Sequence, residues 1–190
     1  MRRLSPAKGT IFHRCESRPT IGAGCLVTVL LLLANVAAAA PCTSAQHRAF
    51  DFWLGDWNVY KSDGSLAGQN RIALVEQGCV LHEQYETAKG YSGQSFTLYD
   101  ASRDRWHQSW VDNQGGLLLL DGGIADSKMV LEGFTQSAQG EQRNRITWSK
   151  ESAGQVRQHW QVKQGETWHT VFVGLYKPRP RSPESVPPSN

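Results

Sequence analysis

The chain of 190 residues lacks the short motifs of the common catalytic and nucleotide-binding sites. It has no Gly-x-Ser-x-Gly nucleophile elbow, no phosphate-binding P-loop and no glycine pattern of a dinucleotide-binding fold. The pair Gly115 and Gly116 leads into a run of leucines, whereas a phosphate-cradling loop requires the N-terminus of a helix after it. We therefore read this pair as a turn and predict no catalytic residues.

A net positive charge is absent outside the first 40 residues. These residues hold five basic side chains and one acidic side chain, a net charge of +4. The whole chain carries +3, so residues 41–190 carry −1. A nucleic-acid-binding domain needs a basic face, which makes a nucleic-acid partner unexpected.

Charged side chains are absent from residues 21–40. An uncharged apolar stretch after a basic segment is typical of a secretory signal peptide. The alanine run at 37–40, with no basic residue directly after it, favours cleavage there. We expect a signal peptide at 1–40 and a periplasmic or secreted mature protein. An uncleaved leader that spans the membrane is the alternative, and it would be the chain's membrane contact.

Cysteine is also scarce, and the chain has no C-x-x-C pair. Two of the four cysteines, Cys15 and Cys25, leave with the expected leader. An even pair in an exported protein predicts a disulfide between Cys42 and Cys79, with a redox or metal role as the alternative. Closing a loop of this length stabilises a fold by roughly 4 kcal/mol on the chain-entropy estimate. No tight spacing suggests three or four converging metal ligands, so we predict no metal site.

The sequence after residue 57 offers no segment long enough for a crossover helix. Clusters of Gly, Asn, Asp and Ser, which favour tight turns, recur every ten to fourteen residues. The segments between them are rich in β-branched and aromatic residues. They predict ten strands, at 57–62, 67–76, 79–87, 93–100, 105–112, 116–123, 128–135, 142–150, 155–163 and 167–176.

Short connections make neighbouring strands antiparallel, and closure of the sheet removes its two exposed edges. We therefore expect an all-β fold: a roughly ten-stranded antiparallel up-and-down barrel with a short N-terminal helix, formed by 41–176 as a single domain. A sandwich of two five-stranded sheets is the alternative. The tail at 177–190 holds five of the eight prolines and is expected to be disordered.

The octet Phe-Asp-Phe-Trp-Leu-Gly-Asp-Trp at 50–57 combines four aromatic residues with one glycine. A helix of a few residues would carry Phe50, Phe52 and Trp53 into an apolar space. Gly55, free to take a positive φ, would end that helix, and Trp57 would start the first strand. We predict a buried N-terminal plug, with direct ligand contact as the alternative.

This octet also carries a resemblance. Its Gly55-Asp56-Trp57 resembles the G-x-W that opens the first strand of lipocalin-type barrels. With segments 78–83, 106–112 and 145–148, the chain from about 50 to 176 resembles a family of secreted bacterial lipocalin-like proteins, which implies a calycin-type barrel and no assigned activity. In lipocalins an arginine from the last strand packs on this tryptophan, and here only Lys177 and Arg179 follow that strand.

Strand alternation indicates which side chains point inward. In 155–163 one face is charged and polar, which places Gln158 and Trp160 inside. In 142–150 the pattern leaves two choices, and we predict that Arg145 lies inside, facing Glu83, Gln108 or Gln158. The candidate ligand-binding residues are Glu83, Tyr85, Trp106, Gln108, Trp110, Arg145, Gln158 and Trp160.

These residues predict an exported, non-catalytic barrel that binds a small, largely apolar ligand and no cofactor. One alternative is an enzyme that uses Glu83 as acid or base and Arg145 to stabilise negative charge. Another is a filled interior whose polar groups satisfy one another. A third is a nitrobindin-like haem barrel with His169 as the buried axial ligand, since His82, His107 and His159 fall on predicted outer faces.

Overall fold

The computed structural model describes residues 41–137 and 140–179, so the expected leader and most of the proline-rich tail lie outside it. The helices are α1 (Ala45–Arg48) and the 3₁₀ turns η1 (Asp51–Trp53), η2 (Glu76–Gly78) and η3 (Ser152–Gly154). The strands are β1 (Gly55–Tyr60), β2 (Leu66–Val75), β3 (Val80–Glu86), β4 (Ser92–Asp100), β5 (Arg105–Asp112), β6 (Leu117–Ala125), β7 (Lys128–Ser137), β8 (Gly140–Lys150), β9 (Val156–Gln164) and β10 (Thr167–Pro178). Within the described ranges, no helix has the length and apolar character to cross a membrane.

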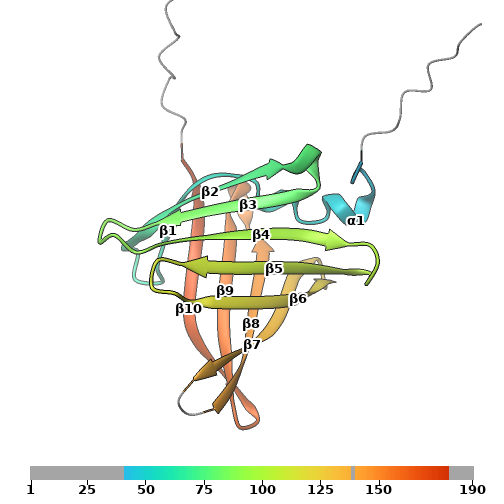
Figure 1. Cartoon of the computed structure of the whole chain (residues 1–190). Coiled ribbons are helices and arrows are strands. Elements are labelled where there is room, and N and C mark those ends of the chain that lie inside the picture. Colours follow the sequence, from blue (N-terminus) through green and yellow to red (C-terminus); the bar gives the residue numbers. More distant parts are fainter. Residues whose placement is uncertain (1–40, 138–139, 180–190) are drawn as a thin grey trace, which may run out of the picture. The chain divides into compact units, whose positions relative to one another are not determined.

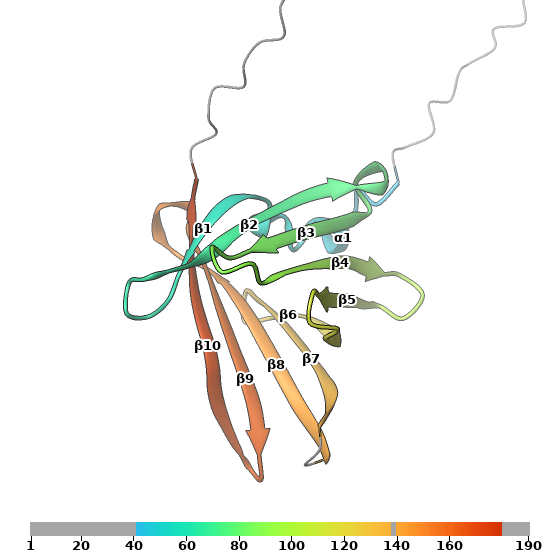
Figure 2. The same cartoon turned by 60° about the vertical axis from the view of Figure 1, so that its left-hand side comes forward.

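The ten described strands form a closed antiparallel barrel (Figure 1). Each strand pairs with its neighbours in the sequence, and β1 closes the sheet by pairing with β10 from Trp57 and Pro178 to Tyr60 and Leu175. In Figure 2 the β7–β8 and β9–β10 hairpins extend beyond the other strands. The up-and-down barrel is confirmed, and the two-sheet sandwich is wrong.

The strand boundaries differ from the prediction by up to two residues, including at the two strands that close the barrel. β1 begins at Gly55 rather than Trp57, and β10 continues through Lys177 to Pro178. Both extensions lie where β1 pairs with β2 and β10. Ladder hydrogen bonds therefore hold residues that the sequence pattern assigned to the plug and the tail.

The predicted plug fills one end of the barrel. Trp53 of the 3₁₀ segment η1 and Phe50, directly before it, are fully buried. Their rings stack on each other with centroids 4.9 Å apart, and both contact Trp148 of β8. Phe50 also meets Trp106 of β5 edge to face, so rings from β5 and β8, which are not adjacent strands, converge on the plug. Burial of these large rings is a main source of the barrel's hydrophobic stabilisation.

Gly55 connects the plug to β1. Its φ is +144°, and a Cβ at this position would lie 3.2 Å from the ring of Trp57. The glycine thus lets Trp57 fold back, where its indole Nε1 donates a 3.0 Å hydrogen bond to the carbonyl of Trp53. The ring neighbour of Trp57 is Tyr176, with centroids 6.2 Å apart. Arg179 donates to the Asp56 carbonyl and to the Gln69 side chain beside this strand start.

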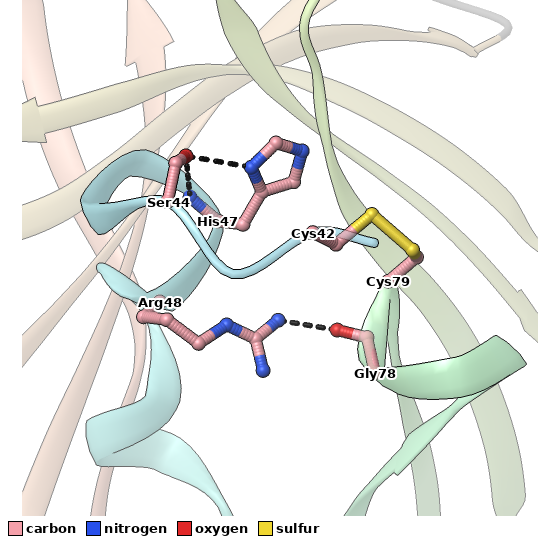
Figure 3. The surroundings of a disulfide bond; sticks show 6 residues. All are labelled: Cys42, Ser44, His47, Arg48, Gly78 and Cys79. Carbon is pink, nitrogen blue, oxygen red and sulfur yellow. Dashed lines mark hydrogen bonds between the residues drawn. A yellow bond between two sulfur atoms is a disulfide. The ribbon is translucent and has the colours of Figure 1, made fainter. Parts of the chain in front are cut away.

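A disulfide joins Cys42, ahead of α1, to Cys79, which follows η2 (Figure 3). The predicted pairing is confirmed. Arg48 of α1 donates to the Gly78 carbonyl next to this bond, and the Ser44 hydroxyl caps the helix by accepting from the His47 amide. The helix and the start of β3 are therefore held together by a covalent bond and a hydrogen bond.

Candidate ligand-binding cavity

The barrel encloses a cavity of about 480 Å³. Its exposed lining residues Gly116, Leu117 and Val171 mark the mouth, and the buried residues Glu83 and Gln108 mark the floor. Ligand pockets in proteins have volumes of roughly 300 to 1,000 Å³. The cavity therefore has the size of a small-molecule site.

The wall is largely aromatic and aliphatic, with Trp110, Trp160, Phe172, Leu118 and Ile146 among its residues. The indole Nε1 of Trp160 donates a 3.0 Å hydrogen bond to Asn144 Oδ1, which fixes the ring. Both aromatic and aliphatic residues come from inward positions of β5, β6, β8, β9 and β10. Such a wall is suited to an apolar ligand.

Two glycines let aromatic rings lie flat against the sheet at the wall. A Cβ on Gly93 would overlap the ring of Trp110, and a Cβ on Gly68 would lie 2.7 Å from the hydroxyl oxygen of Tyr85. The Tyr85 and Trp110 rings are 6.5 Å apart between centroids. Since any larger residue at either glycine would displace a ring, the local sequence preserves the shape of the wall.

A hydrogen-bonded polar cluster forms the floor. The carboxyl group of Glu83 accepts from Asn70 Nδ2 at 2.7 Å and from the Ser95 hydroxyl at 2.6 Å. Gln108 Nε2 donates to Ser95 Oγ at 3.2 Å and to Thr97 Oγ1 at 3.0 Å. All of these side chains are less than 5% exposed. Interior polar groups are thereby largely satisfied by one another, as buried polar groups generally are.

Burial shifts the acid–base behaviour of the floor. Desolvation raises the pKa of Glu83 to about 7, against the smaller opposing effect of the hydrogen bonds from Ser95 and Asn70. Desolvation, followed by the charge of Glu83, also raises the pKa values of Tyr85 and Tyr176. Glu83 thus titrates near neutral pH and can either accept or donate a hydrogen bond there.

Asp112 places a second carboxylate at the mouth. It accepts hydrogen bonds from the amides of Gly116 and Gln114 at 2.8 and 2.9 Å, and from the Tyr91 hydroxyl at 3.1 Å. The Gly116 amide is the largest cause of its lowered pKa. Desolvation and this contact with Asp112 raise the pKa of Tyr91 to about 12. Asp112 is therefore ionised at neutral pH, and Tyr91 is neutral.

The structure brings together six of the eight candidate residues. The lining includes Glu83, Tyr85, Gln108, Trp110, Gln158 and Trp160. Trp106 points inward as predicted, but it lies at the plug end of the barrel, where its ring contacts Phe50 and Tyr99. It belongs to the plug rather than to the cavity lining. That the six residues bind a ligand stays a prediction.

The prediction that Arg145 lies inside is wrong. Its Nε donates to Glu132 at 2.6 Å, and its guanidinium carbon lies 4.0 Å from the centroid of the Trp168 ring. Asn144, Ile146 and Trp148 occupy the buried face of β8 instead. Burial of Ile146 and Trp148 removes much apolar surface from water, whereas an inward guanidinium would be desolvated without Glu132.

The outward Arg145 removes the Glu83–Arg145 pair on which the enzyme alternative rested. The haem alternative fails as well, because His169 is exposed and is not a buried axial ligand. None of the five histidines in the described ranges is buried or lines the cavity. His82, His107 and His159 bond Gln94, Asp121 and Thr170 respectively, on the outer faces expected for them.

Sequence reasoning missed several residues of the site, including Asn70, Ser95, Phe172 and Tyr176. Asn70 and Ser95 reach Glu83 because the ladders place Ser95 opposite Glu83 and Asn70 opposite Tyr85. An inward polar residue on each strand beside β3 could have indicated them. That indication can be used only when the register between the strands is known. Phe172 was hidden by a bulge between Thr170 and Phe172, which reverses the alternation in β10.

Neither the protein-family models nor the curated proteins include a match to this chain.

Proposed function

We propose that the protein is an exported, non-catalytic binding barrel that holds a small, largely apolar ligand in its interior. The observation that carries this proposal is the cavity of about 480 Å³ with an aromatic wall and a polar floor. A barrel that served only as a scaffold would fill this space with side chains, as the plug does at the other end. A few polar groups in a mostly apolar pocket are typical of sites that orient a ligand.

The same proposal includes export and membership of the lipocalin-like family. The disulfide between Cys42 and Cys79 supports an oxidising compartment, since such bonds are rare in the cytosol. The closed meander with Gly55 and Trp57 at the start of β1 supports the family. The arginine contact of lipocalins is replaced by Tyr176 beside Trp57, with Arg179 bonded to Asp56 and Gln69.

Binding of the neutral probe N-phenyl-1-naphthylamine tests the proposal, because its fluorescence rises in an apolar pocket. We expect saturable binding by the wild type and its loss in Leu118→Trp, whose larger ring fills the cavity. Phe134→Ala is the control, since Phe134 is 54% exposed and does not line the cavity. Absence of probe binding by a wild type with a normal melting curve, or equal binding by Leu118→Trp, overturns the proposal.

A further inference from the structure

The floor of the cavity holds a buried acid without a base. Glu83 is 4% exposed, and the side chains that donate hydrogen bonds to it, Asn70 and Ser95, are neutral. Within the described part of the chain, no lysine, arginine or histidine lines the cavity. A carboxylate taken out of water is costly unless a proton or a cation compensates it. The negative charge of an ionised Glu83 is therefore left to be balanced by a cation from outside the protein.

The floor also has more acceptors than donors. The two hydrogens of Gln108 Nε2 are directed to Ser95 and Thr97, and Asn70 Nδ2 is directed to Glu83 and to Tyr176. An ionised carboxylate accepts about four hydrogen bonds, and Glu83 accepts two here. Because Glu83 lines the cavity, its unused capacity suits a ligand group that donates.

Aromatic rings stand next to this acid. Tyr85 lies two residues from Glu83 on the same face of β3, and Trp110 pairs with Ser95, which itself pairs with Glu83. The faces of such rings attract cations, most strongly where water is excluded. Asp112 adds a second negative charge at the mouth. The site thus favours a positively charged head group that donates hydrogen bonds, because its acid, its free acceptors and its aromatic faces all attract such a group.

We infer that the ligand is a cationic amphiphile, a protonated amine whose ammonium group binds Glu83 while its hydrocarbon part lies against Trp110, Trp160 and Ile146. This inference rests on the proposed function, because it names the class of ligand for that same cavity. The ammonium group supplies up to three hydrogen bonds and the missing positive charge. These contacts offset the loss of its hydration, which a neutral wall alone would not.

Protonation of Glu83 governs this preference. The titratable side chains that face Glu83 are Tyr85 on its own strand and Tyr176 on β10, and their pKa values are both raised, so they stay neutral near pH 7. The neighbouring strands β2, β4 and β5 contribute Asn70, Ser95 and Gln108, which do not titrate. Tyr91 and Asp112, near the mouth, keep their charge states around neutrality. The amine preference should therefore follow the ionisation of Glu83.

Displacement of N-phenyl-1-naphthylamine by octylamine, octan-1-ol and octanoate tests the inference with one chain length and three head groups. At about pH 8 we expect octylamine to bind the wild type at least tenfold more tightly than octan-1-ol, the scale of a hydrogen bond to a charged group. In Glu83→Gln this ratio should fall to about one. Glu86→Gln is the matched control, since Glu86 is exposed on the same strand and should keep the ratio.

Wild-type protein alone provides a second measurement that needs no variant to fold. The ratio of octylamine to octan-1-ol affinity should decrease as the pH falls from about 8 to about 5, because Glu83 gains a proton. Equal or tighter binding of octan-1-ol or octanoate at pH 8, or a ratio that survives Glu83→Gln, overturns the inference while probe binding still upholds the proposed function. Failure of the probe itself to bind overturns the proposed function and the inference with it.

Discussion

Glu83 brings its carboxyl group into a floor where its hydrogen-bond donors are the neutral side chains of Asn70 and Ser95. Each of its two oxygens accepts one hydrogen bond, yet burial dominates and raises its pKa to about 7. A neutral donor stabilises the ionised form less than a cation does. Glu83 is therefore maintained at a cost to stability, which is common for groups that serve a binding site.

The cost should be visible in the pH dependence of stability. The folded protein holds the Glu83 proton up to about pH 7, whereas the unfolded chain releases it near the ordinary pKa of 4.5. Unfolding therefore releases a proton between these values, and stability falls as the pH rises through this window, by about 3 kcal/mol. Glu83→Gln mimics the protonated side chain and should lack this fall.

Urea denaturation at about pH 4 and about pH 8 measures the effect. The difference in unfolding free energy between Glu83→Gln and wild type should shift by about 3 kcal/mol in favour of the variant at the higher pH. Glu86→Gln, exposed on the same strand, should show no such shift. Parallel pH profiles for wild type and Glu83→Gln would rule out a strongly perturbed Glu83.

Arg145 shows the opposite case, a charged residue whose partners are all on the outside. Arg145→Met removes a bond to Glu132 and a stacking contact with Trp168, but leaves Glu132 bonded to Arg143. Partly exposed ion pairs contribute about 0–1 kcal/mol, so the loss of stability should stay within that range. Thermal melting of Arg145→Met and its binding of the probe test this expectation. A large destabilisation or a loss of probe binding would indicate that Arg145 lies in the interior.

At the scale of elements, the ten strands were predictable because the turns between them contain Gly, Asn, Asp or Ser, which favour tight turns. The phase of a strand was predictable only where one face is plainly charged, as in β9 with Arg157 and Lys163. In β8 the face with Arg143, Arg145 and Thr147 has no apolar residue, and the other face combines Asn144 with Ile146 and Trp148, so alternation alone favoured the second face as the inner one. In the structure Arg145 is bonded to Glu132 of β7, and Trp148 packs on the plug rings. These are contacts between elements, which alternation within one strand does not contain.

The depth of a residue along the barrel was equally hidden. Trp106, Gln108 and Trp110 share a face of β5, but they reach the plug, the floor and the wall in turn. The alternation of side chains along a strand shows which side of the sheet a residue faces, but not how far along the barrel axis it lies. The predicted site was therefore right about the side of the sheet at seven of eight positions and included one residue of the plug.

The plug should contribute a large share of stability through few side chains. Trp57 is 4% exposed, packs over Gly55 and beside Tyr176, and bonds the Trp53 carbonyl. Trp57→Ala should cost about 3–5 kcal/mol through lost burial and the space left behind. Trp168→Ala, the same change at a partly exposed ring on the outer face, should cost clearly less. Equal denaturation midpoints for Trp57→Ala and wild type would place the ring at the surface.

At the scale of the whole molecule, the barrel is packed at one end and hollow at the other. One end is filled by η1 and the rings of Trp106 and Trp148, while the other end opens into the cavity. Closure between β1 and β10 leaves no free sheet edge among the described strands. Since the closed end carries the apolar core, the open end can retain buried polar groups such as Glu83 and Gln108 without loss of the fold.

The disulfide connects these two ends, because it attaches the segment before the plug to Cys79, directly ahead of β3, the strand that carries Glu83. Cys42 and Cys79 are 37 residues apart in the sequence, and cross-linking a loop of this length stabilises by roughly 4 kcal/mol on the chain-entropy estimate. The double variant Cys42→Ser/Cys79→Ser should lose about this amount, and reductant should bring the wild type to the same denaturation midpoint.

Peptide mapping without reduction, on protein recovered from the periplasm or the medium, should find the two cysteines linked. Two free thiols in that material would contradict both the bond and the oxidising compartment, whereas a linked pair with no effect on stability would mean that the plug, rather than the covalent tie, holds the N-terminal segment in place.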